Sequence, residues 1–220
     1  MIEDALTAIF SHVCGQGRAF GLGGQALPVC ERCLGLYTGA ALTAAWLVAT
    51  GLRRRGLPHL EGAMVQSAAL LAAMAGGLHW ADAGPAWRLA CGLWTGHVAI
   101  LWLTGGANHL LGLAGRASPL DLWPQAFARR VSAPAAPWPW GKRLQTVLAP
   151  AVLAAGACAF AHWAPAGGPG PATWYATSAL VALGAAALVA ALARAAVLSG
   201  AYLLGVLRRR TRAAAAGAGP

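Results

Sequence analysis

The feature that most constrains the fold is a run of nineteen residues, 34–52, without a charged side chain, which ends at Arg53-Arg54-Arg55. A helix needs about 20 mainly apolar residues to cross the hydrocarbon core of a bilayer. The run therefore has the length of one membrane span, and the arginines that follow mark the point where it leaves the membrane. The sequence predicts an integral membrane protein.

The same length criterion predicts four further spans, at residues 62–81, 87–113, 144–164 and 174–192. Gly84-Pro85 predicts the turn between the second and third spans. The last apolar stretch continues to Leu207, which is too long for one perpendicular span. We therefore expect a span to Leu192, Arg194 reaching to the interface, and a partly interfacial helix after it. The predicted fold is all-α: a polytopic helical bundle over residues 34–207, with about five transmembrane helices.

Three segments are expected to differ from membrane-spanning helices. Residues 1–33 form a polar N-terminal segment that carries cysteine and histidine. Residues 114–143 contain five prolines and three tryptophans, which predicts a loop near the lipid headgroups rather than a continuous helix. Residues 208–220 are basic at first and then small and repetitive, which predicts a disordered tail.

Charge is scarce and unevenly placed. Only 10% of the residues are charged, whereas soluble domains carry about 25%. We therefore expect the lipid bilayer to be the main partner of this protein and to contact most of its surface. The net charge of +10 comes mostly from three clusters that lie between or after apolar runs. This distribution is typical of cytoplasmic loops and argues against nucleic-acid binding. A homo-oligomer is compatible with the sequence.

The basic clusters also predict the orientation. Five spans place the two termini on opposite sides of the membrane, and the positive-inside rule puts all three basic clusters in the cytoplasm. The N-terminus is then outside and the C-terminus is cytoplasmic. Four tryptophans fall at the outer interface, as an aromatic belt does: Trp80, Trp87, Trp163 and Trp174.

The clearest chemical motif is Cys30-Glu31-Arg32-Cys33, directly before the first predicted span. Two thiols separated by two residues can chelate one metal ion or close one small disulfide ring. Zinc requires four ligands in a tetrahedron, from cysteine sulfur or histidine nitrogen. The predicted metal ligands are His12, Cys14, Cys30 and Cys33, with zinc as the cofactor that suits them.

Two alternatives stay open. Cys30 precedes a helix N-terminus and lies near Arg32, and both features favour a thiolate, so Cys30 and Cys33 could be the catalytic pair of a membrane thiol-disulfide oxidoreductase. The protein could instead be a small transporter or scaffold with structural cysteines, acting on a small molecule or ion that the sequence does not specify. The sequence alone therefore does not decide whether the protein is an enzyme.

Other polar residues fall at the same predicted depth as the cysteine motif. The further candidates for a site are Arg18, Arg32, His79, Asp82 and Arg88. Asp82 and Arg88 could pair across the turn between two spans. Ionisable residues at membrane depth often have a functional role, although these two also suit the headgroup zone. We expect His97 to face a neighbouring helix as a packing residue.

Glycines recur at four-residue spacing in two of the predicted spans. Gly35 and Gly39 lie in the first, and Gly92 and Gly96 lie in the third. This spacing lets two helices approach closely in a membrane. In a chain with 29 glycines the pattern is common, so it predicts helix packing and no further function.

The N-terminal motif resembles the signature of an uncharacterised prokaryotic membrane-protein family, labelled domain of unknown function 2085. The stretch Pro28-Val29-Cys30-Glu31-Arg32-Cys33-Leu34-Gly35-Leu36-Tyr37-Thr38-Gly39 follows its pattern closely. The preceding part departs from it, with Gly15 where the pattern has histidine and Ala19 where it has serine. The resemblance implies a multi-pass protein of a prokaryotic plasma (inner) membrane. It supports a site at the cysteine motif and implies no particular reaction.

Overall fold

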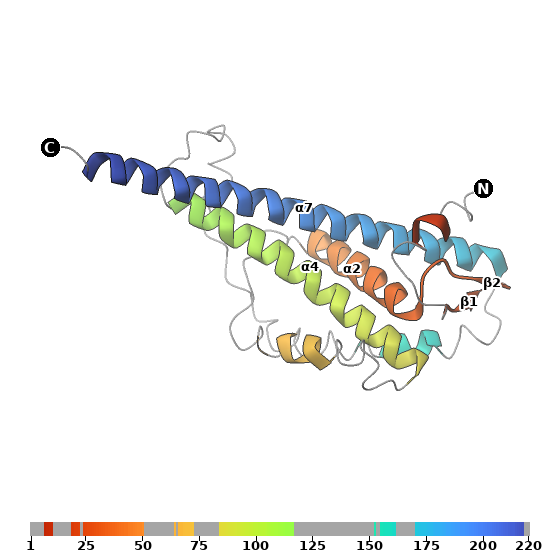
Figure 1. Cartoon of the computed structure of the whole chain (residues 1–220). Coiled ribbons are helices and arrows are strands. Elements are labelled where there is room, and N and C mark those ends of the chain that lie inside the picture. Colours follow the sequence, from red (N-terminus) through yellow and green to blue (C-terminus); the bar gives the residue numbers. More distant parts are fainter. Residues whose placement is uncertain are drawn as a thin grey trace.

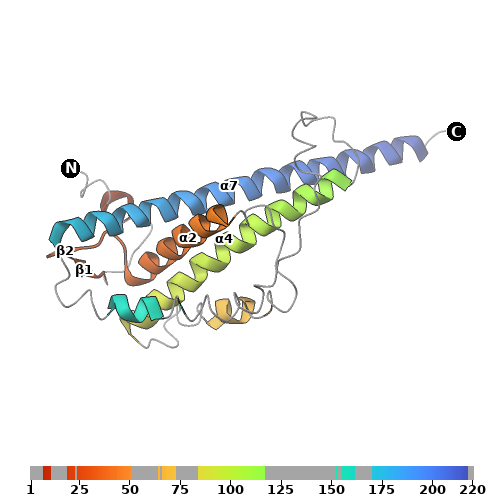
Figure 2. The same cartoon turned by 180° about the vertical axis from the view of Figure 1, so that it is seen from behind.

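The computed structural model describes residues 7–10, 19–22, 24–50, 64, 66–72, 84–116, 152, 155–161 and 170–217. Its elements are the strands β1 (Gly21–Leu22) and β2 (Gln25–Ala26) and the helices α2 (Glu31–Ala49), α4 (Pro85–Arg116) and α7 (Gly170–Gly217). The strands pair in an antiparallel hairpin. Three long helices lie side by side and the hairpin sits at one end of them (Figures 1 and 2). The predicted helical architecture is confirmed for the described residues.

Three helices are long and apolar enough to cross a membrane, over Glu31–Ala49, Pro85–Leu111 and Pro171–Leu207. They correspond to the predicted spans 34–52, 87–113 and 174–192. The predicted spans 62–81 and 144–164 contain the helical residues 66–72 and 155–161, but most of both lies outside the described residues. The same holds for nearly all of the predicted loop 114–143. The total of five spans therefore stays a prediction.

Helix α2 begins three residues before the predicted span. Cys30 is its N-cap, with an extended backbone, and its carbonyl accepts the first helical hydrogen bond from the Leu34 N–H at 2.8 Å. Residues 31–33, which the sequence assigned to the polar segment, therefore form the first turn. At its start α4 has Gly84 with φ +100° followed by Pro85, and proline suits the first helical position because no partner for its N–H is needed there.

Helices α2 and α4 run parallel to each other. Near their N-terminal ends Gly35 faces the backbone of Leu89. Two turns further along both helices, the Thr43 hydroxyl lies 2.9 Å from Nδ1 of His97. Early residues of α2 therefore contact early residues of α4, and later residues contact later ones. The N-terminal ends of both helices lie at the same end of the bundle.

Helix α7 runs in the same direction. Near its start the Trp174 indole N–H donates to the carbonyl of Ala26, just before α2, at 3.0 Å. Farther along, Arg194 donates to the side chain of Asn108, near the end of α4, at 2.7 Å. All three long helices are therefore parallel, as Figures 1 and 2 show.

Residues 66–72 run the opposite way along α4. The Trp102 indole donates to Gln66 at 2.8 Å, while Leu70 packs against the cluster of Cys91, Trp94 and Val98, which lies nearer the start of α4. A chain that crosses a membrane twice in one direction must recross it in between. The direction of residues 66–72 fits such a return.

Helix α7 is a single uninterrupted helix of 48 residues. The sequence predicted a span to Leu192 with a partly interfacial helix after it, and the helix does continue through Arg194. It ends at Gly217, within the tail predicted at residues 208–220. The physical reason is local: the stretch after Leu192 is rich in Ala, Leu, Val and Arg, lacks proline, and thus favours continuing the helix. The Arg194 charge is accommodated without a break in the helix, because its guanidinium donates to the Asn108 side chain of the neighbouring helix α4.

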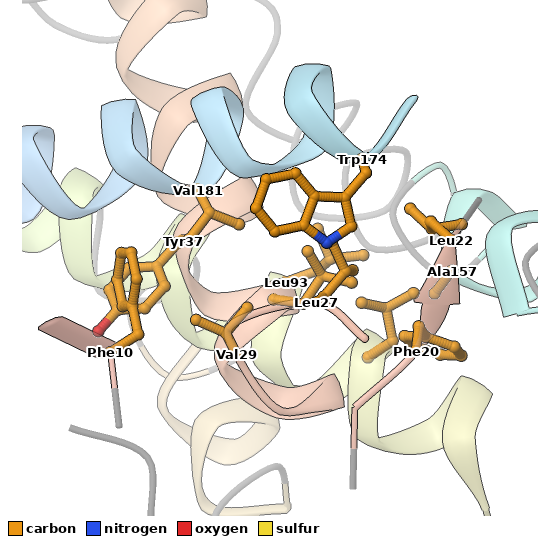
Figure 3. Close-up of a cluster of buried hydrophobic side chains, with 12 residues drawn as sticks. Phe10, Phe20, Leu22, Leu27, Val29, Tyr37, Leu93, Ala157, Trp174 and Val181 are labelled. Atoms are coloured by element: carbon orange, nitrogen blue, oxygen red, sulfur yellow. The ribbon is translucent and has the colours of Figure 1, made fainter. Parts of the chain in front are cut away.

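The main core lies at the N-terminal end of the bundle. Aromatic and aliphatic side chains from the N-terminal segment pack there against the three helices (Figure 3). The segment contributes Phe10, Phe20, Leu22, Leu27 and Val29, and the three helices contribute Leu34, Tyr37, Leu89, Leu93, Trp174 and Val181. Ala157, from the helical residues 155–161, completes the cluster. The region that the sequence described as polar thus supplies much of the core, because its apolar side chains turn inward around the hairpin.

Candidate functional site

The two motif cysteines lie on the first turn of α2. Cys30 is the N-cap and is 5% exposed, and Cys33, three residues later, is partly exposed and packs against the core cluster. Side chains three residues apart share one face of a helix. No disulfide joins any two of the four described cysteines, Cys30, Cys33, Cys91 and Cys158. The structure thus places both motif cysteines at the N-terminal end of α2.

An ion pair fixes this turn to the neighbouring helix. Glu31, between the two cysteines, accepts from the Arg88 guanidinium at 2.7 Å, and the side chains are 10% and 11% exposed. Sequence reasoning singled out Arg88 but suggested Asp82 as its partner, and Asp82 lies outside the described residues. The sequence did contain a signal for the Glu31–Arg88 pair. The two residues carry opposite charges and lie at the starts of two spans that are predicted to begin on the same side of the membrane.

The glycine pairs bring α2 and α4 into backbone contact directly below the ion pair. A Cβ on Gly39 would lie 2.9 Å from Cα of Leu93, and one on Gly96 would lie 2.8 Å from the backbone N of Ala40. A Cβ on Gly92 would collide with the carbonyl oxygen of Arg32, inside the cysteine motif. The packing role predicted for these glycines is confirmed, and it holds the motif at a fixed position relative to α4.

A polar pair lies deeper in the same interface. The Thr43 hydroxyl donates to the Gly39 carbonyl at 2.7 Å and lies 2.9 Å from Nδ1 of His97. Since a hydroxyl has one proton, the Nδ1 of His97 must be the donor in the second bond. His97 therefore faces the neighbouring helix as predicted, and it joins α2 to α4 inside the apolar interface.

The other predicted site residues are placed only in part. Of the four predicted metal ligands, Cys30 and Cys33 are brought together, while His12 and Cys14 lie outside the described residues. Among the remaining candidates Arg32 and Arg88 are described, and Arg18, His79 and Asp82 are not. Within the described part of the chain, no three His, Cys, Asp or Glu side chains are grouped closely enough to hold a metal ion.

Comparison with known proteins bears on this same region. Residues 14–102 match the family described as "Predicted membrane protein (DUF2085)". The resemblance seen in the motif is thereby confirmed. The match extends through α2 and most of α4, so it contains both motif cysteines, the Glu31–Arg88 pair and the glycine interface, whereas α7 lies beyond it. No curated protein and no solved structure matches the chain.

Proposed function

We propose that the protein holds a zinc ion at the N-terminal end of α2, with Cys30, Cys33, His12 and Cys14 as ligands. One observation carries the proposal: Cys30 and Cys33 lie together at the N-terminal end of a helix that is anchored in the bundle. Paired cysteine thiolates are preferred zinc ligands in structural sites. A rigid helical turn would keep the two sulfur atoms ready for one ion.

The proposed metal has a structural role. It would fasten the start of the chain to the helix ends, beside the core that Phe10 and Phe20 already make with the bundle. Binding a metal to the folded state stabilises that state. The site itself requires no substrate, so this proposal assigns the chain no reaction.

The proposal places the protein in the plasma (inner) membrane of a prokaryote, with five spans, the N-terminus outside and the C-terminus cytoplasmic. The parallel directions of α2, α4 and α7 support it, because three parallel spans in one chain require two return crossings. The cluster Arg208–Arg212 at the far end of α7 then falls in the cytoplasm, as the positive-inside rule requires.

Thiol-disulfide exchange is the second candidate, and the position of Cys30 favours it. As the N-cap of α2, this cysteine lies at the positive end of the helix dipole, which stabilises a thiolate. An outer face is also an oxidising environment. Cys30 would attack a substrate disulfide and Cys33 would resolve the mixed disulfide, leaving a Cys30–Cys33 disulfide and a reduced dithiol substrate.

Metal content and accessible thiols, measured together on the detergent-purified protein, test the two candidates. We expect about one zinc per chain, lost in each of Cys14→Ser, Cys30→Ser and Cys33→Ser. Cys158→Ser is the matched control, because Cys158 is exposed and on a different helical segment, and it should keep its zinc.

The other outcomes are decisive as well. Zinc retained in Cys14→Ser would contradict the proposed ligand set. No zinc together with a Cys30–Cys33 disulfide would favour the redox candidate, and titration of the pair against a thiol buffer would then give its reduction potential. No zinc and no redox couple would contradict both candidates.

A further inference from the structure

Helix α7 is covered by the rest of the protein far less than its neighbours. In its most apolar stretch 11% is buried, compared with 44% for α2 and 61% for α4. Large apolar side chains remain exposed along its whole length: Leu183, Val189, Leu192, Val197, Leu203, Leu204 and Leu207. Such a surface requires an apolar partner.

The length of α7 indicates how it meets a bilayer. Its apolar stretch of 37 residues is about 55 Å long at 1.5 Å per residue. An upright helix would leave about 25 Å of apolar helix outside the hydrocarbon core, because the core is about 30 Å thick. At a tilt of about 40°, the upper end of the range seen in membrane proteins, the stretch projects to about 42 Å. The length outside the core then falls to about 12 Å, and both ends lie at headgroup depth in a bilayer of about 40–45 Å.

The charges of α7 identify the partner as lipid rather than a second copy of the helix. Four arginines follow the apolar stretch within Arg208–Arg212, and no acidic residue occurs anywhere after Asp121. Two parallel copies of α7 would bring these arginines together and repel each other. An anionic lipid surface instead attracts such a cluster.

The one charge inside the apolar stretch has a partner within the bundle. Arg194 donates to the Asn108 side chain of α4 at 2.7 Å. Arg194 lies 13 residues before Leu207, so in the tilted helix it falls inside the bilayer, where a polar partner offsets part of the cost of a charge. Arg194 is therefore compatible with a helix that stays in lipid as far as Leu207.

We propose that α7 crosses the bilayer at a steep tilt, with the middle of its exposed apolar face against acyl chains and the two ends of the stretch Pro171–Leu207 at headgroup depth. The cluster Arg208–Arg212 then contacts anionic headgroups of the leaflet opposite the hairpin. This inference rests on the proposed membrane location of the protein and does not depend on the zinc site. Zinc content measured on the same samples therefore shows whether the zinc proposal fails, and the lipid experiments below show whether the α7 proposal fails.

Spin-label accessibility in liposomes tests the lipid contact. A nitroxide is attached through a genetically encoded non-cysteine residue at position 183, 197, 203 or 207, so that the native cysteines stay in place. We expect the labels at 183 and 197 to be accessible to oxygen and protected from a water-soluble nickel chelate. The labels at 203 and 207, at headgroup depth, should be less accessible to nickel than a label in water. Nickel accessibility at 203 and 207 equal to that of a label in water would mean that the end of α7 projects into water. Low accessibility to both reagents would mean cover by another copy. Either result would overturn the proposal.

Lipid charge tests the arginine cluster. A label at the exposed residue Thr211 should lose mobility in vesicles that contain phosphatidylglycerol, relative to pure phosphatidylcholine. Replacing all four arginines of the cluster by glutamine should abolish the difference, and Arg194→Gln should leave it unchanged. Equal mobility in the two kinds of vesicle would contradict headgroup contact.

Discussion

Glu31 and Arg88 are 57 positions apart in the chain and meet at 2.7 Å where α2 and α4 begin. Taking two charges out of water costs several kcal/mol per ion, and a close pair offsets that cost only with good geometry. The pair is therefore better evidence for how the helices are aligned than for high stability. Removing a single partner is a different matter, because the remaining charge stays buried.

We predict that Arg88→Ala lowers the free energy of unfolding by about 3 kcal/mol, since Glu31 loses its guanidinium partner. Denaturant unfolding of the detergent-purified protein, followed by circular dichroism, measures the change. Glu31→Gln combined with Arg88→Met should recover most of the loss, because no charge is left buried. The control Arg194→Ala removes an exposed arginine and should cost under about 1 kcal/mol. Equal losses for the two alanine variants would show that burial of the pair is unimportant.

The sequence identified some residues of the site and missed others. Cys30 and Cys33 are recognisable from their spacing alone. Glu31 was not, because an acidic residue at the start of a helix is usually solvated and favourable there in its own right. Its partner comes from another helix, and nothing in the local sequence specifies which side chain of α4 lies opposite.

At the scale of helices, α2 and α4 are held together by backbone contact. In lipid, helix association depends on close packing rather than on the hydrophobic effect, and small residues make that packing possible. Gly35, Gly39, Gly92 and Gly96 provide it, and the bond between Thr43 and His97 adds a polar contact within the same interface.

We predict that Gly92→Ala and Gly96→Ala each destabilise the protein by about 2 kcal/mol, because a Cβ there would overlap backbone atoms of α2 that have no room to move. Gly106→Ala, in the same helix, is the matched control. No atom lies within 4 Å of a Cβ built at Gly106, so the change should be neutral or stabilising by up to about 1 kcal/mol. Thermal unfolding midpoints compare the three variants, and similar midpoints would contradict tight packing.

Helix α7 carries one charged side chain inside its apolar stretch. The sequence predicted that Arg194 extends to the interface beyond a span ending at Leu192 and that a helix continues after it. The structure shows the continuing helix, which ends at Gly217, and adds a partner for the arginine, Asn108 of α4. The cost of a charge depends on neighbouring helices, and the sequence does not show them.

At the scale of the whole molecule, three parallel helices share one end with the hairpin and the cysteine motif. We predict that cysteines introduced at Gln25, Pro85 and Ala172, close to the starts of α2, α4 and α7, react equally with a membrane-impermeant maleimide added outside intact cells. A cysteine at Thr211 should react only after the membrane is permeabilised. Labelling of each variant is measured relative to the parent protein, which corrects for the native cysteines.

The outcomes at Pro85 and Ala172 are the critical ones. If either differed from Gln25, the three helices could not cross one bilayer in the same direction, and the return crossings in the two connecting segments would not be needed. Labelling at Thr211 together with the other three sites would instead contradict the crossing of α7.

The sequence by itself determined that the chain is helical and membrane-bound, and it located α2, α4 and the start of α7. Length and hydrophobicity suffice for this, because a bilayer imposes the same requirement on every span. The parallel directions of α2, α4 and α7 agree with the five alternating spans that the sequence predicts. Only the tertiary structure decided the Glu31–Arg88 and Thr43–His97 contacts and the inward packing of the N-terminal segment. These contacts depend on which helix surfaces meet. Residues distant in the chain determine that through close packing and the pairing of buried polar groups.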